Sequence, residues 1–462
     1  MPKYFIITFG CQMNKSDSER IASVLKKIGL KSSPTIKGVD LIVVNMCSVR
    51  QSAVDRVWGL IPKFQKLKLE NPQLKTVLTG CILSQDKRKF REKFDLILSI
   101  KDLPRWPNYL QSQFKTLPLS PSCFDFNSKT ELKSPSNFSV LIPIIIGCNN
   151  FCSYCVIPYT RGPEISRPWQ EIVKEAKKAI RKGAKEIWLL GQNVNRYYSK
   201  SKLKAQKSKI INFAKLLKII NDIPGDFWIR FTSSHPKPGT KVSDRKNFSW
   251  DELIKTIADC KKVTEYINLP VQSGDDEILK RMNRPYTVAQ YKNLIKKIRK
   301  AIPNVCLSTD VIVGFPGETE KQFENTVKLF KEIKFDMAYI AEYSPRPQTA
   351  AFKLEDSVPK KEKERRRKAL TEILKKTALE NNQKYIGKTT VVLVDSVKQS
   401  KSHSSSSNFV YLGKNRTYKT VKFQSQKELV GKFVKVKIIE ALPWGLKGKL
   451  ILSETNNKKF LA

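Results

Sequence analysis

Three cysteines with the spacing C-x₃-C-x₂-C constrain this chain more than any other feature of its sequence. They are Cys148, Cys152 and Cys155, and they directly follow an apolar run over residues 140–146 that is typical of a buried strand. Three thiolates so close together can hold three irons of a four-iron cluster. Because no further cysteine or histidine lies nearby in the sequence, one iron would stay open to a substrate or cofactor.

A zinc site and a disulfide are the competing interpretations of this triplet. A structural zinc site needs four ligands, and the whole chain has only two histidines, His235 and His403. His403 lies in a serine-rich stretch that shows no other sign of chemistry. A disulfide would leave one of the three cysteines over. The pattern therefore favours an iron–sulfur cluster, with zinc as the remaining alternative.

The composition favours a polyanionic partner and a reducing compartment. Lys and Arg number 86 against 42 Asp and Glu, which gives a net charge of +44. Such a charge favours nucleic acid, although a general lysine bias would produce it too. No apolar run approaches the ~20 residues of a membrane helix, and the N-terminus does not resemble a signal peptide. Nine cysteines in such a chain favour the cytoplasm.

Alternating apolar and amphipathic stretches predict a multidomain α/β protein. Residues 1–117 are expected to form a small parallel α/β domain with one helix over residues 53–67, and the Pro- and Ser-rich residues 118–137 a linker. Six strand–helix units in residues 138–380 predict a partial (β/α)₆ barrel of the TIM type. Residues 384–455 are expected to form a small antiparallel β-barrel.

A second set of three cysteines lies in the first predicted domain. Cys11, Cys47 and Cys81 each follow one of its strands. Because parallel strands end at the same edge of a sheet, their thiols can converge and hold a second cluster. The alternative is three buried thiols, a common role for free cysteine. The remaining cysteines, to which we assign no role, are Cys123, Cys260 and Cys306.

Polar residues follow the strands of the predicted (β/α)₆ barrel. Chemistry in such barrels gathers at the carboxyl ends of the strands, so these turns are better interpreted as an active-site floor than as ordinary turns. The candidates for holding a cofactor or substrate are Gln192, Ser233, Ser234, Gln272 and Asp310, with Gly314 and Pro316 shaping a turn.

The C-terminal barrel carries basic side chains mixed with aromatic ones. This mixture suits single-stranded or looped RNA, which is bound by stacking and phosphate contacts. A solvated sheet face is the alternative. The residues concerned are Lys414, Arg416, Lys419 and Lys422 with Tyr411 and Tyr418.

The cysteine loop resembles the radical S-adenosylmethionine superfamily. Together with Cys11, Cys47 and Cys81 and the C-terminal barrel, nearly the whole chain resembles the methylthiotransferase family, whose last domain is a TRAM domain. The strings LLGQNVN (189–195) and RFTSSHP (230–236) favour the branch that modifies N6-dimethylallyladenosine in tRNA. Met46 stands where the family usually has Thr, next to a predicted ligand.

The resemblance implies radical methylthiolation of carbon 2 of N6-dimethylallyladenosine at position 37 of tRNA. Two 4Fe–4S clusters and S-adenosylmethionine would be the cofactors. Gly314 and Pro316 would pack near the adenine of S-adenosylmethionine. The implied partners are the tRNA anticodon stem-loop and a flavodoxin- or ferredoxin-like electron donor, and the enzyme would be a cytoplasmic monomer. The implied ligands are Cys148, Cys152 and Cys155 for the radical cluster and Cys11, Cys47 and Cys81 for the auxiliary cluster.

Two other functions stay open at this point. A methylthiotransferase of another branch would act on threonylcarbamoyladenosine in tRNA or on an aspartate of a ribosomal protein. A non-catalytic iron–sulfur protein that binds RNA or senses redox state would keep the clusters but would not cleave S-adenosylmethionine.

Overall fold

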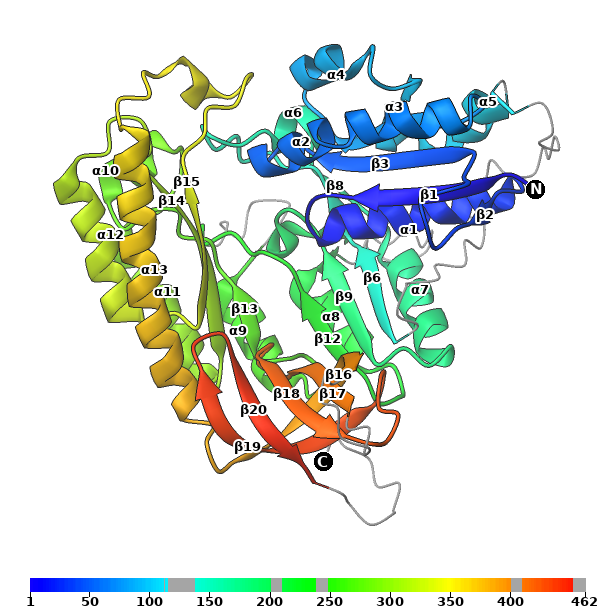
Figure 1. Cartoon of the computed structure of the whole chain (residues 1–462). Coiled ribbons are helices and arrows are strands. Elements are labelled where there is room, and N and C mark those ends of the chain that lie inside the picture. Colours follow the sequence, from blue (N-terminus) through cyan, green and yellow to red (C-terminus); the bar gives the residue numbers. More distant parts are fainter. Residues whose placement is uncertain (112, 115–137, 201–209, 238–247, 400–408, 452–462) are drawn as a thin grey trace. The chain divides into compact units, whose positions relative to one another are not determined.

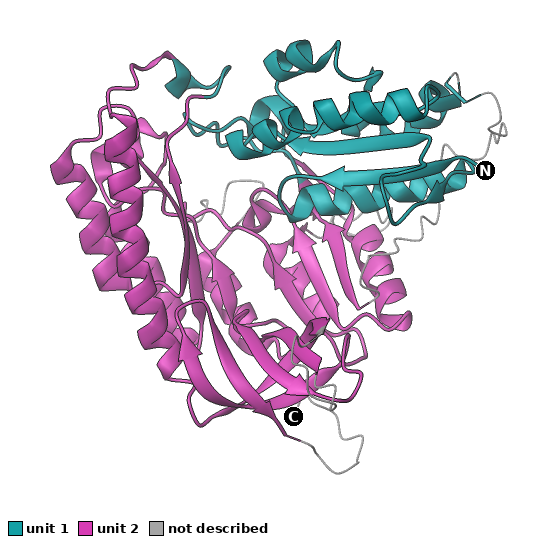
Figure 2. Cartoon of the chain, viewed as in Figure 1, with its two compact units in different colours: residues 1–135, 146–164, 346–352 teal, residues 136–145, 165–345, 353–462 magenta. Residues whose placement is uncertain are grey.

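The computed structural model divides the chain into two compact units, coloured separately in Figure 2. Unit 1 comprises residues 1–135, 146–164 and 346–352, and unit 2 comprises residues 136–145, 165–345 and 353–462. The described residues are 1–111, 113–114, 138–200, 210–237, 248–399 and 409–451. The predicted linker 118–137, Cys123 and His403 lie outside them.

Unit 1 is built around a parallel five-stranded sheet (Figure 1). The strand order is β2-β1-β3-β4-β5, and every neighbouring pair is parallel. This confirms the predicted small parallel α/β domain. The strands are β1 (Lys3–Thr8), β2 (Lys31–Ser32), β3 (Leu41–Cys47), β4 (Lys75–Cys81) and β5 (Leu96–Ile97). The helices are α1 (Gln12–Lys27), α2 (Gln51–Trp58), α3 (Ile61–Glu70), α4 (Ser84–Phe90), η1 (Ile100–Arg105), α5 (Trp106–Gln111) and α6 (Ile157–Arg161).

The single helix predicted over residues 53–67 is wrong, because the structure has α2 and α3 there. The break falls at Gly59 and Leu60, and Pro62 stands in the first turn of α3. Proline is favoured at a helix start because it lacks the N–H that would be unpaired there. The apolar periodicity continued across the break, which concealed it in the sequence.

Unit 2 contains the six predicted barrel strands. Three form the parallel set β12-β9-β6 and three the parallel set β13-β14-β15. A parallel bridge between Ile229 and Val263 links the two sets, so the partial (β/α)₆ barrel is confirmed. The strands are β6 (Ser139–Pro143), β9 (Glu186–Leu190), β12 (Trp228–Phe231), β13 (Tyr266–Asn268), β14 (Cys306–Val313) and β15 (Met337–Glu342).

Helices cover the outside of these strands and alternate with them along the chain (Figure 1). They are α7 (Trp169–Arg181), α8 (Phe213–Asn221), α9 (Trp250–Asp259), α10 (Asp276–Arg281), α11 (Val288–Ala301), α12 (Glu320–Ile333) and α13 (Lys360–Gln383). The shorter elements are β7 (Ile145–Ile146), β8 (Ile165–Ser166), η3 (Val194–Arg196), β10 (Tyr198–Lys200), β11 (Ile210–Asn212) and η4 (Ala350–Lys353).

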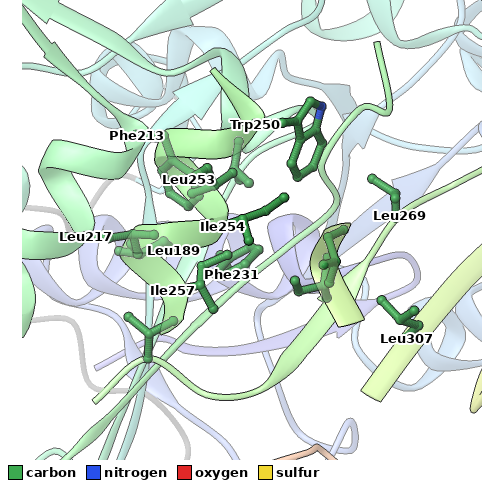
Figure 3. Packing of buried hydrophobic residues seen from close by; sticks show 14 of the residues in the cluster. Leu189, Phe213, Leu217, Phe231, Trp250, Leu253, Ile254, Ile257, Leu269 and Leu307 are labelled. Atoms are coloured by element: carbon green, nitrogen blue, oxygen red, sulfur yellow. The ribbon is translucent and has the colours of Figure 1, made fainter. Parts of the chain in front are cut away.

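One large apolar core joins the helices to the inner strands of unit 2. Phe213 from α8 and Phe231 from β12 meet edge to face with ring centroids 5.3 Å apart, and Leu253 and Ile257 of α9 pack beside them (Figure 3). Removing such side chains from water contributes roughly 25 cal/mol per Å². The apolar faces of the helices pack against this core. No helix in the described part of the chain combines the length and apolarity that crossing a membrane requires.

The C-terminal part of unit 2 is a closed five-stranded barrel with the order β16-β17-β18-β20-β19. All pairs are antiparallel except β18 with β20, so the predicted small antiparallel barrel is confirmed with one parallel contact. The strands are β16 (Thr389–Gln399), β17 (Phe409–Asn415), β18 (Thr420–Ser425), β19 (Phe433–Leu442) and β20 (Gly445–Leu450).

Arg230 fastens this small barrel to the amino ends of the larger barrel's strands. Its guanidinium pairs with Glu186 at the start of β9 (Nε to Oε1, 2.5 Å). It also donates to the backbone carbonyls of Asn415 and Arg416 at 2.7 and 2.9 Å. The ring of Tyr418 lies against it, 5.0 Å from its Cζ. The turn between β17 and β18 therefore docks at the end of the strands opposite to the polar turns.

This docking overturns the RNA role predicted for most of the basic residues of the small barrel. Arg416 pairs with Glu265, and Lys419 is buried and pairs with Asp336 at 2.7 Å. Lys414 donates to Thr420 and lies over the Tyr418 ring. Tyr411 is buried as well, and only Lys422 is exposed. Arg416, Lys419 and Tyr418 face the larger barrel, whereas Tyr411 stacks on Phe423 inside the small barrel.

We expect Arg230→Ala to lower the free energy of unfolding by about 3–5 kcal/mol, because the change leaves Glu186 as an unpaired buried charge. Urea denaturation of the full chain measures this. Arg181→Ala, at an exposed position on α7, is the matched control and should change stability by about 0.5 kcal/mol or less. Equal shifts for the two variants would contradict the docking role.

Candidate active site

The second set of cysteines lies at the carboxyl edge of the unit 1 sheet. Cys47 ends β3 and Cys81 ends β4, and the two are direct register partners. Cys11 precedes α1, where its N–H and its thiol both donate to the Oδ1 of Asn14, at 3.3 and 3.4 Å. The Nδ2 of Asn14 lies 3.9 Å from the sulfur of Cys81. One asparagine thus touches two of the three cysteines, and the three thiols share one edge.

These three cysteines differ in exposure and in acidity. Cys47 and Cys81 are buried beside Ala53 and Phe9, whereas Cys11 is exposed. A hydrogen bond from the Cys81 thiol lowers the pKa of Cys47, and the same bond together with burial raises the pKa of Cys81. A hydrogen bond therefore couples the two buried thiols.

Glycines without room for a side chain shape the backbone just before two of the cysteines. Gly80 precedes Cys81 with φ +112°, and a Cβ there would lie 2.1 Å from the carbonyl oxygen of Met46. Gly147 precedes Cys148 with φ +78°, and its Cβ would lie 2.1 Å from the carbonyl oxygen of Pro163. Only glycine adopts these conformations without strain, so both positions require a glycine immediately before the cysteine.

The loop that carries Cys148, Cys152 and Cys155 also belongs to unit 1. The N–H of Cys155 donates to the carbonyl of Cys152 at 2.9 Å, and the N–H of Cys148 donates to the carbonyl of Gly162 at 3.2 Å. The carbonyl of Ser153 accepts from the N–H of Ala351 at 2.7 Å. Hydrogen bonds within the loop, and one bond to a second segment of the same unit, thus hold its backbone in place.

The donor sets fit iron–sulfur clusters better than a single metal ion. Each set offers three soft sulfur ligands, which suit Fe–S clusters, and the eight described cysteines form no disulfide. No three cysteine, histidine or carboxylate side chains among the described residues surround a common point as the ligands of one ion would. Cysteines of a four-iron cluster each bind a different iron and so need not share such a point.

In unit 2 the structure links two of the predicted strand-end residues through one that the sequence did not single out. Asn268, at the end of β13, donates from Nδ2 to Ser233 at 2.8 Å and to Asp310 at 3.1 Å. Its Oδ1 accepts from Ser308 at 2.8 Å. Asn268, at the carboxyl end of β13, therefore holds together a hydroxyl that follows β12 and a carboxylate in the interior of β14.

Four buried polar atoms at the ends of β9 and β12 have no hydrogen-bond partner within the described chain. Buried polar groups are nearly always paired, so four unpaired atoms in two adjacent turns indicate that a polar ligand supplies their partners. Two belong to the predicted residues Gln192 and Ser234, and two to residues not singled out before. The atoms are Gln192 Oε1, Asn193 Nδ2, Ser234 Oγ and His235 Nε2.

The hydrogen bonds of His235 fix its tautomer. Its Nδ1 accepts from the N–H of Lys237 at 3.1 Å, and burial lowers its pKa well below the ordinary 6.5. The neutral ring must then carry its proton on Nε2. Asn195 locks the backbone of His235 from both sides, accepting from its N–H at 2.9 Å and donating to its carbonyl at 3.0 Å. His235 is thus a fixed hydrogen-bond donor.

The last three predicted residues lie in turns that the surrounding side chains brace. Gln272 has a left-handed φ of +73° and exchanges backbone hydrogen bonds with Asp310 and Ile312 on β14. Gly314 donates its N–H to Glu318 at 2.6 Å. The carbonyl of Pro316 accepts from the guanidinium of Arg281.

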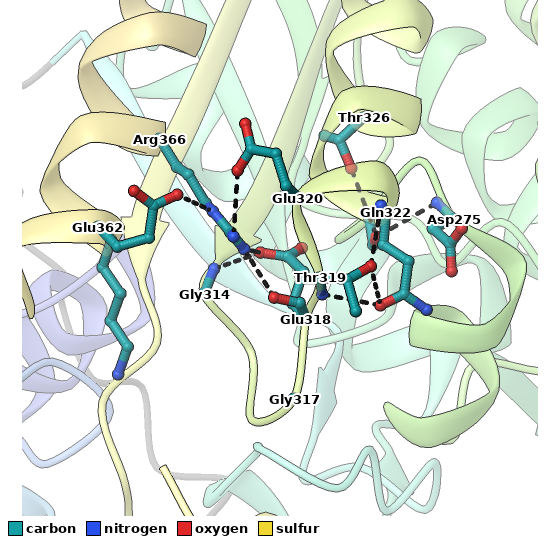
Figure 4. Close-up of polar contacts among 12 residues, drawn as sticks. Asp275, Gly314, Gly317, Glu318, Thr319, Glu320, Gln322, Thr326, Glu362 and Arg366 are labelled. Atoms are coloured by element: carbon teal, nitrogen blue, oxygen red, sulfur yellow. Dashed lines mark hydrogen bonds and ion pairs between the residues drawn. The ribbon is translucent and has the colours of Figure 1, made fainter. Parts of the chain in front are cut away.

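Figure 4 shows how the turn after β14 is anchored. Arg366 from α13 donates to the Glu318 carboxylate at 2.8 Å, and both side chains are buried. Burial raises the pKa of Glu318, although its bonds to Gly314 and Arg366 favour the charged form. Thr319 then caps α12 through the backbone of Gln322. Glu318 lies close in sequence to the predicted Gly314 and Pro316, but Arg366 lies too far along the chain for the sequence to pair the two.

Models of three protein families match the chain in succession. A model described as uncharacterized protein family UPF0004 matches residues 3–100, the radical SAM superfamily matches residues 142–330, and the TRAM domain matches residues 383–451. The order agrees with the predicted domains, whose boundaries stay predictions.

Among solved structures, the radical S-adenosylmethionine methyltransferase TsrM from Kitasatospora setae is similar with a TM-score of 0.52. The identity is 13%, and the match covers 76% of this chain and 74% of that chain. This likeness supports the fold.

Curated relatives match over almost the full length. The tRNA-2-methylthio-N(6)-dimethylallyladenosine synthase of Clostridium botulinum is 40% identical over 97% of both chains. That of Dictyoglomus thermophilum is 40% identical over 98% of this chain and 99% of its own. That of Carboxydothermus hydrogenoformans is 39% identical over 97% and 99%. With its two cysteine sets and three successive family matches, the chain belongs to the tRNA-2-methylthio-N(6)-dimethylallyladenosine synthase family.

Proposed function

We propose that this chain replaces the hydrogen on carbon 2 of N6-dimethylallyladenosine in tRNA by a methylthio group. The observation that carries this proposal is the 40% identity over 97% of the chain to synthases of that name. The two cysteine sets on glycine-shaped turns and the orphaned polar atoms at the barrel strand ends support it independently. When bound, two 4Fe–4S clusters and S-adenosylmethionine supply the radical and the sulfur.

In this proposal the six cysteines of unit 1 hold the two clusters. Cys148, Cys152 and Cys155 would hold the radical cluster, and their closed loop would keep the three thiolates in place. The second set would hold the auxiliary cluster at the sheet edge. The members of that set are Cys11, Cys47 and Cys81.

The strand ends of unit 2 would bind S-adenosylmethionine and the base. Asn193 and His235 offer N–H donors, and Gln192 offers an oxygen acceptor. Ser233 and Asp310, held by Asn268, add a hydroxyl and a carboxylate. Because His235 is neutral and carries its proton on Nε2, which has no partner within the described chain, its part is to donate to a ligand acceptor and not to transfer a proton.

Iron counting together with a product assay tests this function. Anaerobically reconstituted protein should hold about eight irons per chain, four for each cluster. With reductant, S-adenosylmethionine and tRNA bearing N6-dimethylallyladenosine, it should form the 2-methylthio nucleoside. About four irons, or cofactor cleavage without methylthiolation, would contradict the two-cluster proposal.

The outer face of the small barrel is the better candidate for the RNA contact. Lys437 on β19 and Lys449 on β20 are exposed and lie directly opposite each other. Like charges in that position are unfavourable unless an anion joins them. Lys422 on β18 is exposed as well, whereas its register neighbour Lys447 on β20 pairs with Glu440 at 2.9 Å. Exposed lysines on one face suit contacts with phosphates.

We expect the double change Lys437→Gln and Lys449→Gln to weaken tRNA binding and to reduce the slope of log K against log salt by about two, because each phosphate contact contributes roughly one. Filter binding across a salt series measures this. Lys321→Gln with Lys328→Gln, both exposed on α12, removes the same charge elsewhere. An equal loss of slope in that control would show that only net charge matters.

The electron donor and the oligomeric state are further parts of this proposal. The net charge of +44 favours an acidic electron carrier of flavodoxin or ferredoxin type, since opposite charges speed encounter. A tRNA substrate and oxygen-sensitive clusters are compatible with a cytoplasmic monomer. Gel filtration of reconstituted protein, with and without tRNA, measures the oligomeric state.

A further inference from the structure

Arg161 joins the two cysteine sets inside unit 1. It is the last residue of α6, six residues beyond Cys155, and its side chain is only 3% exposed. Its Nε donates to the sulfur of Cys81 at 2.9 Å, and its Nη2 donates to the Oδ2 of Asp17 at 2.7 Å. Asp17 lies on α1 and is itself buried. The guanidinium of Arg161, which follows the C-x₃-C-x₂-C loop in the chain, therefore donates to a thiol of the second set of cysteines.

Two groups satisfy this guanidinium, the Asp17 carboxylate and the Cys81 sulfur. An arginine this deeply buried is costly unless its partners are well placed. With Nη2 engaged by Asp17, the Nε–H is directed at the Cys81 sulfur, so Asp17 fixes the orientation of the donor.

The same arginine is tied to the backbone that anchors the cysteine loop. Gly162, its neighbour, accepts the N–H of Cys148 through its carbonyl. Gly147 packs so closely on Gly162 and Pro163 that no side chain would fit. A shift of Arg161 would therefore disturb the start of the loop as well as Cys81.

We propose that Arg161 is a positioning residue for the auxiliary cluster, whose guanidinium donates to the ligand sulfur of Cys81 and stabilises the one-electron reduced state. This inference rests on the proposed function, because it assumes a cluster on Cys11, Cys47 and Cys81. Hydrogen bonds to cluster sulfurs and nearby net charge set the reduction potential. Added electron density on the ligand sulfur strengthens a hydrogen bond from a cation.

Two substitutions should shift the potential in opposite directions. Arg161→Gln removes the cation and makes the cluster harder to reduce. Asp17→Asn keeps a partner oxygen for Nη2 but removes a neutralising negative charge, so the cluster becomes easier to reduce. A merely structural role would loosen the site in both variants and could not produce this difference in sign.

The experiment is a redox titration of the full chain followed by electron paramagnetic resonance. Cys148, Cys152 and Cys155 are replaced by alanine so that only the auxiliary cluster remains, and dithionite supplies the electron. At the midpoint potential of this background, Arg161→Gln should lower the ratio of reduced to oxidised cluster at least tenfold, which is 59 mV for a one-electron couple. Asp17→Asn should raise the ratio. Arg161→Lys, which keeps the charge but not the Nε–H, should show a smaller decrease.

A control variant tests whether the shift in potential is specific to Arg161 and Asp17. Lys68→Gln breaks the surface pair with Asp95 in the same unit and should leave the ratio unchanged. Shifts of Arg161→Gln and Asp17→Asn in the same direction, or no shift in variants that hold about four irons, would overturn the role of Arg161. A background protein that binds no iron would overturn the proposed function, and this inference with it.

Discussion

The Cys152→Ala variant is expected to form no 5′-deoxyadenosine from S-adenosylmethionine. Cys152 is the middle ligand of the C-x₃-C-x₂-C loop, and its carbonyl holds the N–H of Cys155. Removing this thiolate leaves two ligands in the loop, too few for a cluster with one open iron. Chromatography of reduced, anaerobic reaction mixtures measures the product.

The matched control for this prediction is Cys260→Ala. Cys260 is buried at the end of α9 and has no assigned role, so that variant should keep cofactor cleavage. Cleavage at the normal rate by Cys152→Ala would refute the assignment of the radical cluster to this loop.

Cys47→Ala is expected to separate cofactor cleavage from methylthiolation. The variant should lose the auxiliary cluster, so that iron falls from about eight to about four per chain. The radical cluster stays, so 5′-deoxyadenosine should still form while the 2-methylthio product disappears. Iron analysis and nucleoside mass spectrometry on the same sample measure both effects.

Cys306→Ala serves as the control here, because Cys306 is a buried cysteine at the start of β14 in unit 2. It should keep both clusters and both activities. Full methylthiolation by Cys47→Ala would show that the sheet edge of unit 1 does not deliver the sulfur.

The positions of Cys47 and Cys81 were predictable because neighbouring parallel strands end at the same edge of a sheet. Cys47 and Cys81 end neighbouring strands in direct register, as the strand pattern predicted. Pairings across long stretches of chain were not predictable. Nothing in the sequence connects Asp17 with Arg161, or Lys419 with Asp336, since each contact joins segments of one unit that lie far apart in the chain.

The small barrel illustrates the same limit. Its basic and aromatic residues were visible in the sequence, but the pattern did not reveal which of them face another part of the protein. Arg416 and Lys419 form ion pairs with carboxylates of the larger barrel, whereas Lys437 and Lys449 are exposed. At the strand ends, Asn268 was missed because an asparagine between strand and loop usually signals only a turn.

Nucleosides from a bacterial strain that lacks its own tRNA methylthiotransferase and carries this chain test the central claim most directly. Mass spectrometry of digested tRNA should show N6-dimethylallyladenosine converted to its 2-methylthio form, and the Cys152→Ala chain should leave it unconverted. A methylthio group on threonylcarbamoyladenosine, or unmodified N6-dimethylallyladenosine despite a fully loaded protein, would contradict the proposed function.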